Sequence, residues 1–243
     1  MLEQINLETI IFLDVETVPK YKSFELLSAD EQDFWIHKKK RMNADEMDVN
    51  EHYFGNAGIF AEFGRIICIS CGILTKSQQH HQLRIKSFYG DNETEILLQF
   101  KELLDKHLVK FGDFGVCGHN INEFDIPYIC RRMLINQIDL PIVLDRLTGK
   151  KPWENLNIDT MQLWKFGDYK SYISLKMLTH ILQVPSPKDD IDGSQVAQVY
   201  YGENGGLDRI KRYCQKDVVA VVQLILRFKN MPLLKEDQII ITN

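Results

Sequence analysis

The chain has 243 residues, 44% of them hydrophobic, and a formal net charge of −5 at pH 7. This composition is typical of an ordinary globular protein and excludes a disordered or fibrous chain. The slight negative charge argues against a broad basic surface for long duplexes, but it is compatible with a local basic groove beside an acidic site. We expect a single α/β domain over residues 1–243.

The five cysteines are odd in number and lie mostly within apolar runs, which is typical of buried, reduced thiols. Cys68 and Cys71 do not favour a zinc site, because residues three apart on a strand point to opposite faces. The N-terminus lacks the basic and apolar regions of a signal peptide. The longest apolar run, residues 218–226, is too short to span a bilayer. We therefore expect a cytoplasmic protein with no membrane partner.

The first predicted strand ends in a pair of acids. Residues 9–15 are mostly large and apolar, which predicts a buried strand with Asp14 and Glu16 at its carboxyl end. Residues two apart on a strand face the same side, so both carboxylates point into the same space. An isolated Asp-x-Glu is more often a polar turn than a site. A functional interpretation therefore needs further acids.

The next segments predict structure around this strand. A capping box at residues 28–31 predicts a helix that runs to about residue 41. Residues 43–64 are polar, acidic and Gly-containing, which predicts an irregular excursion or a lid. Residues 65–75 and 82–89 predict two adjacent strands, which form a meander with the first strand.

The middle of the chain supplies a third acid. Apolar spacing predicts a helix over residues 91–110, and residues 114–118 predict a buried strand. Asp125 follows, at or just before a helix N-terminus, because Pro127 is compatible with the first helical turn. Asp125 is therefore compatible with a capping role, a metal-binding role or both. Asp159 ends another short strand, where a cap is favoured over a ligand.

The last predicted helix, residues 207–229, carries Tyr213 and Asp217. Their spacing of four residues places the phenol and the carboxylate on one helical face. An unpaired carboxylate beside a buried apolar face costs several kcal/mol unless a cation or hydrogen bonds compensate it. No Gly-rich phosphate loop follows a predicted strand, so a P-loop or dinucleotide-binding fold is unsupported.

Four carboxylates converge if the helices pack near the carboxyl edge of the sheet: Asp14, Glu16, Asp125 and Asp217. Two like charges about 4 Å apart cost on the order of 4 kcal/mol at an intermediate dielectric, so the cluster requires cations. Ligand sets made only of oxygen favour Mg²⁺ or Mn²⁺. Two such ions roughly 3.5 to 4 Å apart promote in-line displacement at phosphorus, and the Tyr213 hydroxyl can then orient the attacking water.

Three segments resemble, in order, the exonuclease motifs of the DEDD superfamily: FLDVET at 12–17, NINEFD at 120–125 and YCQKD at 213–217. The tyrosine four residues before the last Asp indicates the DEDDy subclass, since the sister subclass carries a His at the position of Arg212. The middle motif is most similar to the proofreading domain of family B DNA polymerases. The resemblance spans residues 10–228 and implies a stand-alone 3′-to-5′ exonuclease. The implied fold is ribonuclease H-like, a mixed five-stranded sheet flanked by helices.

The resemblance also implies roles for the acids and the tyrosine. Asp14 bridges both divalent cations, and Glu16 and Asp217 complete the site of the first ion. Asp125 serves the second ion, partly through water. Tyr213 positions the nucleophile without binding a cation.

The resemblance also implies which residues bind the substrate. Glu16 and the backbone after it, at Thr17, lie near the terminal 3′-hydroxyl. Asn120 and Phe124 resemble residues that shape the pocket for the terminal nucleotides, although Phe124 is equally compatible with a core position. Lys216 is a candidate phosphate contact.

These observations predict an enzyme that removes nucleoside 5′-monophosphates from the 3′ end of single-stranded DNA. One alternative is an exoribonuclease or oligoribonuclease, because no motif encodes contacts to a 2′-hydroxyl. A second alternative is a catalytically idle scaffold that binds nucleic acid. The sequence does not determine the biological pathway, the oligomeric state or the protein partners.

Overall fold

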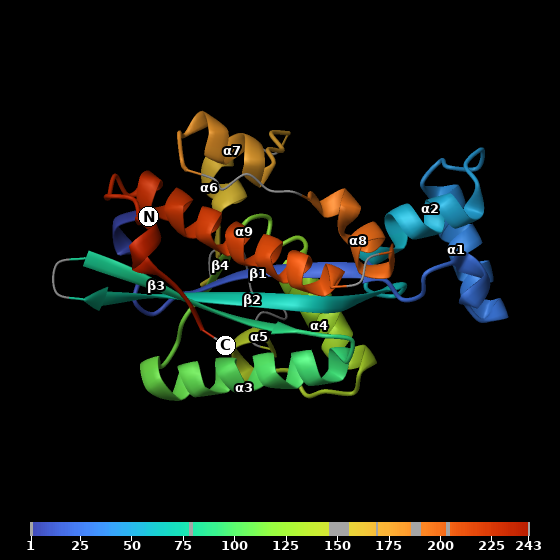
Figure 1. Cartoon of the computed structure of the whole chain (residues 1–243), viewed down its shortest axis with the longest axis horizontal. Helices are drawn as coiled ribbons and strands as arrows, with labels where there is room; N and C mark the ends of the chain where they lie inside the picture. The colour runs from blue at the N-terminus through green and yellow to red at the C-terminus, as the bar shows by residue number, and fades with distance from the viewer. Residues whose placement is uncertain are drawn as a thin grey trace.

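The computed structural model describes residues 2–77, 80–145, 156–168, 170–185, 191–202 and 205–242. Figure 1 shows one mixed sheet between two layers of helices. The strand order in this sheet is β5-β4-β1-β2-β3-β6. The mixed α/β architecture is confirmed, whereas the prediction of five strands is wrong, because the described chain forms a six-stranded sheet.

Three long antiparallel strands form the centre of the sheet: β1 (Ile11–Pro19), β2 (Gly64–Ser77) and β3 (His80–Tyr89). The predicted meander is therefore confirmed. Asp14 and Glu16 were expected at the carboxyl end of this strand, but they lie within β1, because β1 continues to pair with β2 as far as Pro19. The acids are thus held by a rigid ladder on a central strand.

Three short parallel strands extend the sheet. On one side β4 (Val116–Gly118) pairs with β1, and β5 (Ile158–Asp159) pairs with β4. On the other side β6 (Ile239–Thr242) pairs with β3. Strand β6 is the sixth strand, which the sequence did not predict. Four apolar residues carry too little periodicity to identify a strand, and its partner lies more than a hundred residues earlier.

The layer on one face of the sheet contains α3 (Glu93–Phe111), α4 (Asp125–Ile135) and α5 (Ile142–Asp145) (Figure 1). These helices share a hydrophobic core with Ile11, Leu13 and Val15 of β1. The predicted helix of residues 91–110 is confirmed, and its cap is Asn92, whose side chain accepts a hydrogen bond from the backbone of Glu95.

The layer on the other face contains α6 (Thr160–Lys165), α7 (Leu175–Ile181), α8 (Val196–Gly202) and the long α9 (Gly206–Phe228). The apolar stripe of α9 packs on Phe12 of β1. Since side chains alternate along a strand, Asp14 and Glu16 lie on the same side of β1 as Phe12. The β1 acids therefore face α9.

A separate helical lobe contains α1 (Ala29–Arg41) and α2 (Val49–Asn56), at the right of Figure 1. The capping box of α1 is confirmed, with both Ser28–Glu31 hydrogen bonds present. The two helices bury Trp35 and Tyr53 in a small core of their own. The prediction that residues 43–64 are irregular is wrong, because α2 forms there with Asp48 as its cap. Whether this lobe acts as a lid stays a prediction.

Short 3₁₀ turns join these elements at Leu2–Gln4, Phe24–Leu26, Ala57–Ile59, Gly193–Gln195 and Glu236–Gln238. Within the described ranges, none of the helices has the length and apolar character needed to cross a membrane.

Candidate active site

Strand β1 places two acids directly beneath α9. Asp14 is half-buried and Glu16 is 7% exposed. The thiol of Cys214 donates a 3.4 Å hydrogen bond to the backbone oxygen of Asp14. Carboxylate oxygens of Asp14 and Glu16 and the sulfur of Cys214 all lie within 4.8 Å of one another. The structure therefore brings the first predicted acid pair to the surface of α9.

Asp125 approaches β1 from the side of β4, the neighbour of β1 opposite β2. Strand β4 pairs with β1 at Ile11 and Phe12, and Asp125 interacts with the β1 backbone further along, at Val15. Asp125 is the first residue of α4 and is buried. Burial raises its pKa to about 7, and the charges of Asp159 and Asp217 act in the same direction. Its side chain is thus within electrostatic reach of α9.

Helix α9 supplies the remaining acid and the tyrosine. Tyr213 is half-buried and forms a side-chain hydrogen bond with Asp217. Burial raises the pKa of the Tyr213 phenol, and the charges of Asp217, Glu16 and Asp14 raise it further. The hydroxyl therefore keeps its proton at neutral pH and can act as a donor.

The electrostatics of this acid cluster favour a cation. Burial raises the pKa of Asp14 to about 7, followed by the effect of the Asp125 charge. Burial also raises the pKa of Glu16 well above its ordinary value, helped by the charges of Asp14 and Asp217. The Oδ2 atom of Asp14 is buried and has no hydrogen-bond partner among the described residues. A hard divalent cation fits this oxygen donor set, because it would pair the orphaned oxygen and relieve the mutual repulsion.

The predicted substrate-binding residues flank the acids in different ways. Asn120 has a left-handed backbone, with φ of 61°, and its Oδ1 atom is buried without a partner among the described residues. Phe124 packs partly against the core, with its ring 5.4 Å from that of Tyr128. Thr17 follows a register shift in β1 and lies beside Tyr128. Lys216 is half-buried on α9, one residue before Asp217.

Two residues beside the acids were missed as parts of the site. Asp159 was predicted as a helix cap, and it does accept hydrogen bonds from the first backbone N–H groups of α6. It also accepts from the backbone N–H groups of Asn120 and Asn122, at 2.9 and 3.3 Å, so it holds the loop before Asp125. For Cys214, the sequence predicts only a buried thiol. Neither contact has a signal in local sequence, because each joins distant segments.

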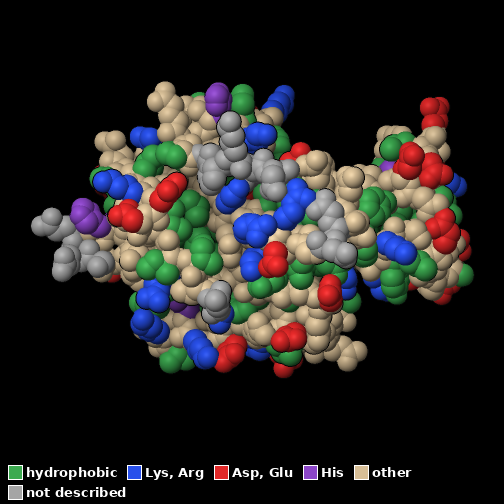
Figure 2. Space-filling model, in the orientation of Figure 1, with side chains coloured by type: hydrophobic (Ala, Val, Ile, Leu, Met, Phe, Trp, Pro, Cys, Tyr) green, Lys and Arg blue, Asp and Glu red, His purple; other side chains and the backbone are tan. Residues whose placement is uncertain are grey.

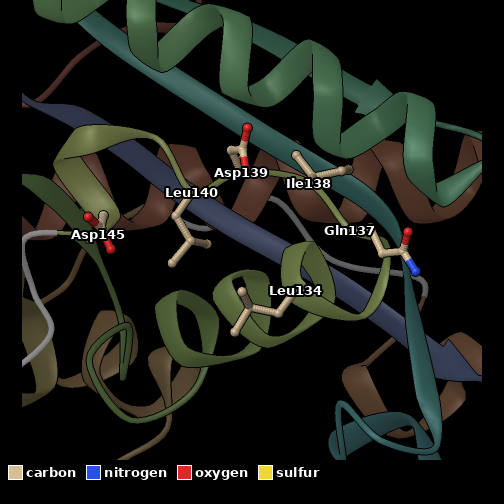
Figure 3. A pocket seen from close by; sticks show the side chains of 6 residues that line it. All are labelled: Leu134, Gln137, Ile138, Asp139, Leu140 and Asp145. Atoms are coloured by element: carbon tan, nitrogen blue, oxygen red, sulfur yellow. The ribbon is translucent and has the colours of Figure 1, made fainter.

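Two surface cavities lie away from these acids. One, of about 560 Å³, lies where α4 ends and α5 begins, as Figure 3 shows. Its lining residues are Leu134, Gln137, Ile138, Asp139, Leu140 and Asp145. The other, of about 630 Å³, lies between α3 and β3. Neither cavity contains a residue predicted for the active site.

Comparison with known proteins agrees with this architecture. The family B DNA polymerase from the hyperthermophilic archaeon Pyrobaculum calidifontis has a similar fold, with a TM-score of 0.52 and 16% sequence identity. The match covers 90% of this chain but 24% of the polymerase, so the chain corresponds to about a quarter of that protein. The expected ribonuclease H-like class of fold is thereby confirmed. No protein of curated function matches the chain.

One family model matches residues 59–238, which include the second and third motifs and follow the β1 acids. It describes a predicted 3′-5′ exonuclease related to the exonuclease domain of PolB. Since the match covers well over half of the sequence, the chain belongs to this family of predicted PolB-related exonucleases.

Proposed function

We propose that the chain is a divalent-cation-dependent enzyme that removes nucleoside 5′-monophosphates from the 3′ end of single-stranded DNA. The observation that supports this most directly is the state of Asp14. Its pKa is raised to about 7 by burial, and one of its buried oxygens has no partner among the described residues. A carboxylate in this state, surrounded by other acids, is poorly stabilised without a cation. Such a cluster is typical of phosphoryl-transfer sites.

Four carboxylates would hold the cations. We assign Asp14 to both ions, Glu16 and Asp217 to the first, and Asp125 to the second. Their oxygen ligands favour Mg²⁺ or Mn²⁺ over softer metals. When bound, the two ions supply a water of lowered pKa and stabilise the negative charge that develops on the phosphate oxygens.

Tyr213 orients the attacking water in this proposal. Its phenol stays protonated, because burial and the neighbouring acids raise its pKa. Its hydrogen bond with Asp217 restricts the position of the hydroxyl. A donor fixed in this way can hold a water in line with the scissile bond, which lowers the entropic part of the barrier. Tyr213 is therefore a positioning group and not a general base.

Position supports the proposed substrate-binding roles. Thr17 comes directly after Glu16 in β1, and we assign its backbone to the terminal sugar. Asn120 offers a buried oxygen without a partner among the described residues, which a nucleotide can satisfy. Phe124 provides a half-buried ring at the N-terminus of α4. Lys216 is the cationic residue next to Asp217, and it is assigned to a phosphate.

The test is the release of mononucleotides from a 5′-labelled single-stranded oligonucleotide in the presence of Mg²⁺ or Mn²⁺. Asp14→Asn and Asp217→Asn should each lower the rate by about 10²- to 10³-fold or more, because each removes charge from the cation site. Asp208→Asn is the matched control, since this exposed α9 aspartate pairs with Lys211 at 3.0 Å outside the cluster. Full activity in Asp14→Asn would contradict the proposal.

The same assay distinguishes the alternatives. Matched DNA and RNA strands of one sequence compare the two sugars directly, and DNA is expected to be cleaved faster. Faster cleavage of RNA would reassign the substrate and leave the chemistry unchanged. Tight binding without cleavage in either metal would instead support a scaffold that binds nucleic acid.

A further inference from the structure

The connection between α6 and α7 carries two of the most exposed aromatic side chains of the described chain. Phe166 is 91% exposed and Tyr172 is 71% exposed. We propose that Phe166 and Tyr172 form a stacking platform for the bases of a single-stranded nucleic acid, upstream of the nucleotide that occupies the active site. The inference deepens the proposed function and rests on it for the direction of the strand.

The segment that carries the platform is held at two points, Asp159 and Ile173, to the loop that precedes Asp125. At its start, Asp159 caps α6 and holds the backbone N–H of Asn120 at 2.9 Å. At its end, the Nε2 atom of His119 is 2.9 Å from the backbone oxygen of Ile173, within hydrogen-bond distance. The segment therefore leaves the site at Asp159 and returns to it at Ile173. Its position relative to the acids is set by these contacts.

The length of α6 gives the scale of the distance from Asp159 to Phe166. Six helical residues separate Asp159 from Phe166, which corresponds to a rise of about 9 Å. At about 3.4 Å per stacked nucleotide, this is roughly three nucleotides. For a strand that runs from the acids along α6, the platform lies about three nucleotides upstream of the 3′ end.

The turn after α6 holds Phe166 away from the core. Phe166 has a left-handed backbone, with φ of 46°, a conformation that is uncommon for a bulky residue. The turn is closed by a 2.8 Å hydrogen bond from the backbone N–H of Asp168 to the Lys165 oxygen. The Asp168 side chain accepts another, of 3.0 Å, from the backbone of Lys170. This hydrogen-bonded turn presents the ring to solvent.

The positive charge of this region favours a nucleic acid as the molecule that binds the platform. Residues 160–181 contain three lysines, Lys165, Lys170 and Lys176, against one aspartate, Asp168. Figure 2 shows that Lys and Arg side chains also gather on this face at the level of α9. Alternating aromatic and cationic side chains favour single-stranded nucleic acid, since rings stack on bases while cations pair with phosphates. The acidic net charge of the whole chain makes this local excess of cations more distinctive.

The experiment measures binding in the absence of cleavage. Fluorescence anisotropy with EDTA present gives the Kd of a labelled DNA strand of about 12 nucleotides and of a dinucleotide, lengths chosen to lie on either side of the platform distance. Phe166→Ala and Tyr172→Ala should each raise the Kd of the long strand about tenfold and leave that of the dinucleotide unchanged. Tyr172→Phe keeps an aromatic ring and should retain most of the affinity.

A matched control lies on another part of the chain. Phe34 of α1 is 63% exposed, so Phe34→Ala removes a ring from the surface without touching the platform. Thermal unfolding of each variant checks that the fold is intact. An unchanged Kd for the long strand in the Phe166→Ala/Tyr172→Ala double variant would overturn the proposal. An equal loss for the dinucleotide would overturn it as well, because the platform lies beyond the reach of two nucleotides.

Together with the cleavage assay described above, these binding measurements test the platform and the nuclease activity separately. If the chain binds single strands in this length-dependent way but cleaves none of them, the proposed function fails and the platform stands. If it cleaves short and long strands equally in wild type and double variant, the platform fails and the nuclease activity stands.

Discussion

The Oδ1 atom of Asp159 accepts a 2.9 Å hydrogen bond from the backbone N–H of Asn120, a residue 39 positions earlier in the chain. Asn120 has a positive φ, so the loop needs this support to keep an uncommon conformation. The same oxygen accepts from the backbone of Met161 at 2.9 Å. One carboxylate therefore joins the start of α6 to the loop that leads to Asp125.

Asp159→Ala should lower the free energy of unfolding by about 2–3 kcal/mol, because it removes a helix cap and leaves the half-buried backbone N–H groups of Asn120 and Asn122 without this acceptor. Urea unfolding measures this loss. Asp192→Ala is the control, since Asp192 caps the 3₁₀ turn at Gly193 and is exposed. It should cost about 1 kcal/mol or less. Equal losses in the two variants would show that the contact to Asn120 contributes no stability.

Local sequence predicts the elements whose signals are local. The capping box at Ser28 predicts the start of α1, and the apolar stripe after Asp217 predicts the buried face of α9. Alternation along β1 predicts that Asp14 and Glu16 share one side of a strand. Each of these patterns depends on residues within a few positions of one another.

The remaining features depend on contacts between distant segments. Strand β6 exists because the edge of β3 is available to pair with it. Helix α2 is stabilised by packing against Trp35 of α1, which its own polar sequence does not indicate. The end of β1 is set by its pairing with β2, so the acids lie inside the strand. The hydrogen bond between Asp159 and the backbone of Asn120 cannot be predicted from local sequence for the same reason.

A buried ion pair ties α4 to the sheet. Arg132 donates to Glu93 through Nε and Nη2, at 2.8 and 2.5 Å, and Glu93 also accepts from the backbone of Ile66 at 2.7 Å. Glu93→Ala should lower the free energy of unfolding by about 3–5 kcal/mol, because it leaves the buried guanidinium without its carboxylate. Urea unfolding tests this value against Glu102→Ala, which breaks an exposed pair on α3. The control should lose less than about 1 kcal/mol, and a similarly small loss in Glu93→Ala would contradict the prediction.

The acid cluster should make the metal-free protein less stable as pH rises. The pKa of Asp14 and that of Asp125 are both raised from 3.8 to about 7, mainly by burial. Between about pH 4 and pH 7 the folded state therefore binds more protons than the unfolded state, and the free energy of unfolding falls with pH. Thermal unfolding in EDTA should give a higher Tm near pH 5 than near pH 8.

Two additions identify the acids as the source of this effect. Mg²⁺ at about pH 8 should restore stability, because it binds the ionised folded state and not the unfolded chain. Asp14→Asn should raise the metal-free stability at that pH by about 1–2 kcal/mol. Glu102→Gln, which alters an exposed acid, should leave the pH dependence unchanged. A Tm that rises steadily from pH 5 to pH 8 without metal would contradict the assignment.

Tyr213→Phe should lower turnover by about 10- to 100-fold, because the attacking water loses a fixed donor. It should leave the affinity for Mn²⁺, measured by titration calorimetry, within about twofold of wild type, since the phenol binds no cation in the proposed arrangement. Tyr89→Phe is the control, because that hydroxyl lies 3.0 Å from Lys211 at the exposed side of α9. Because burial and the nearby acids raise the pKa of Tyr213, wild-type turnover should not fall at alkaline pH through loss of its proton. Loss of Mn²⁺ binding in Tyr213→Phe would instead show that the phenol is one of the groups that hold the cations.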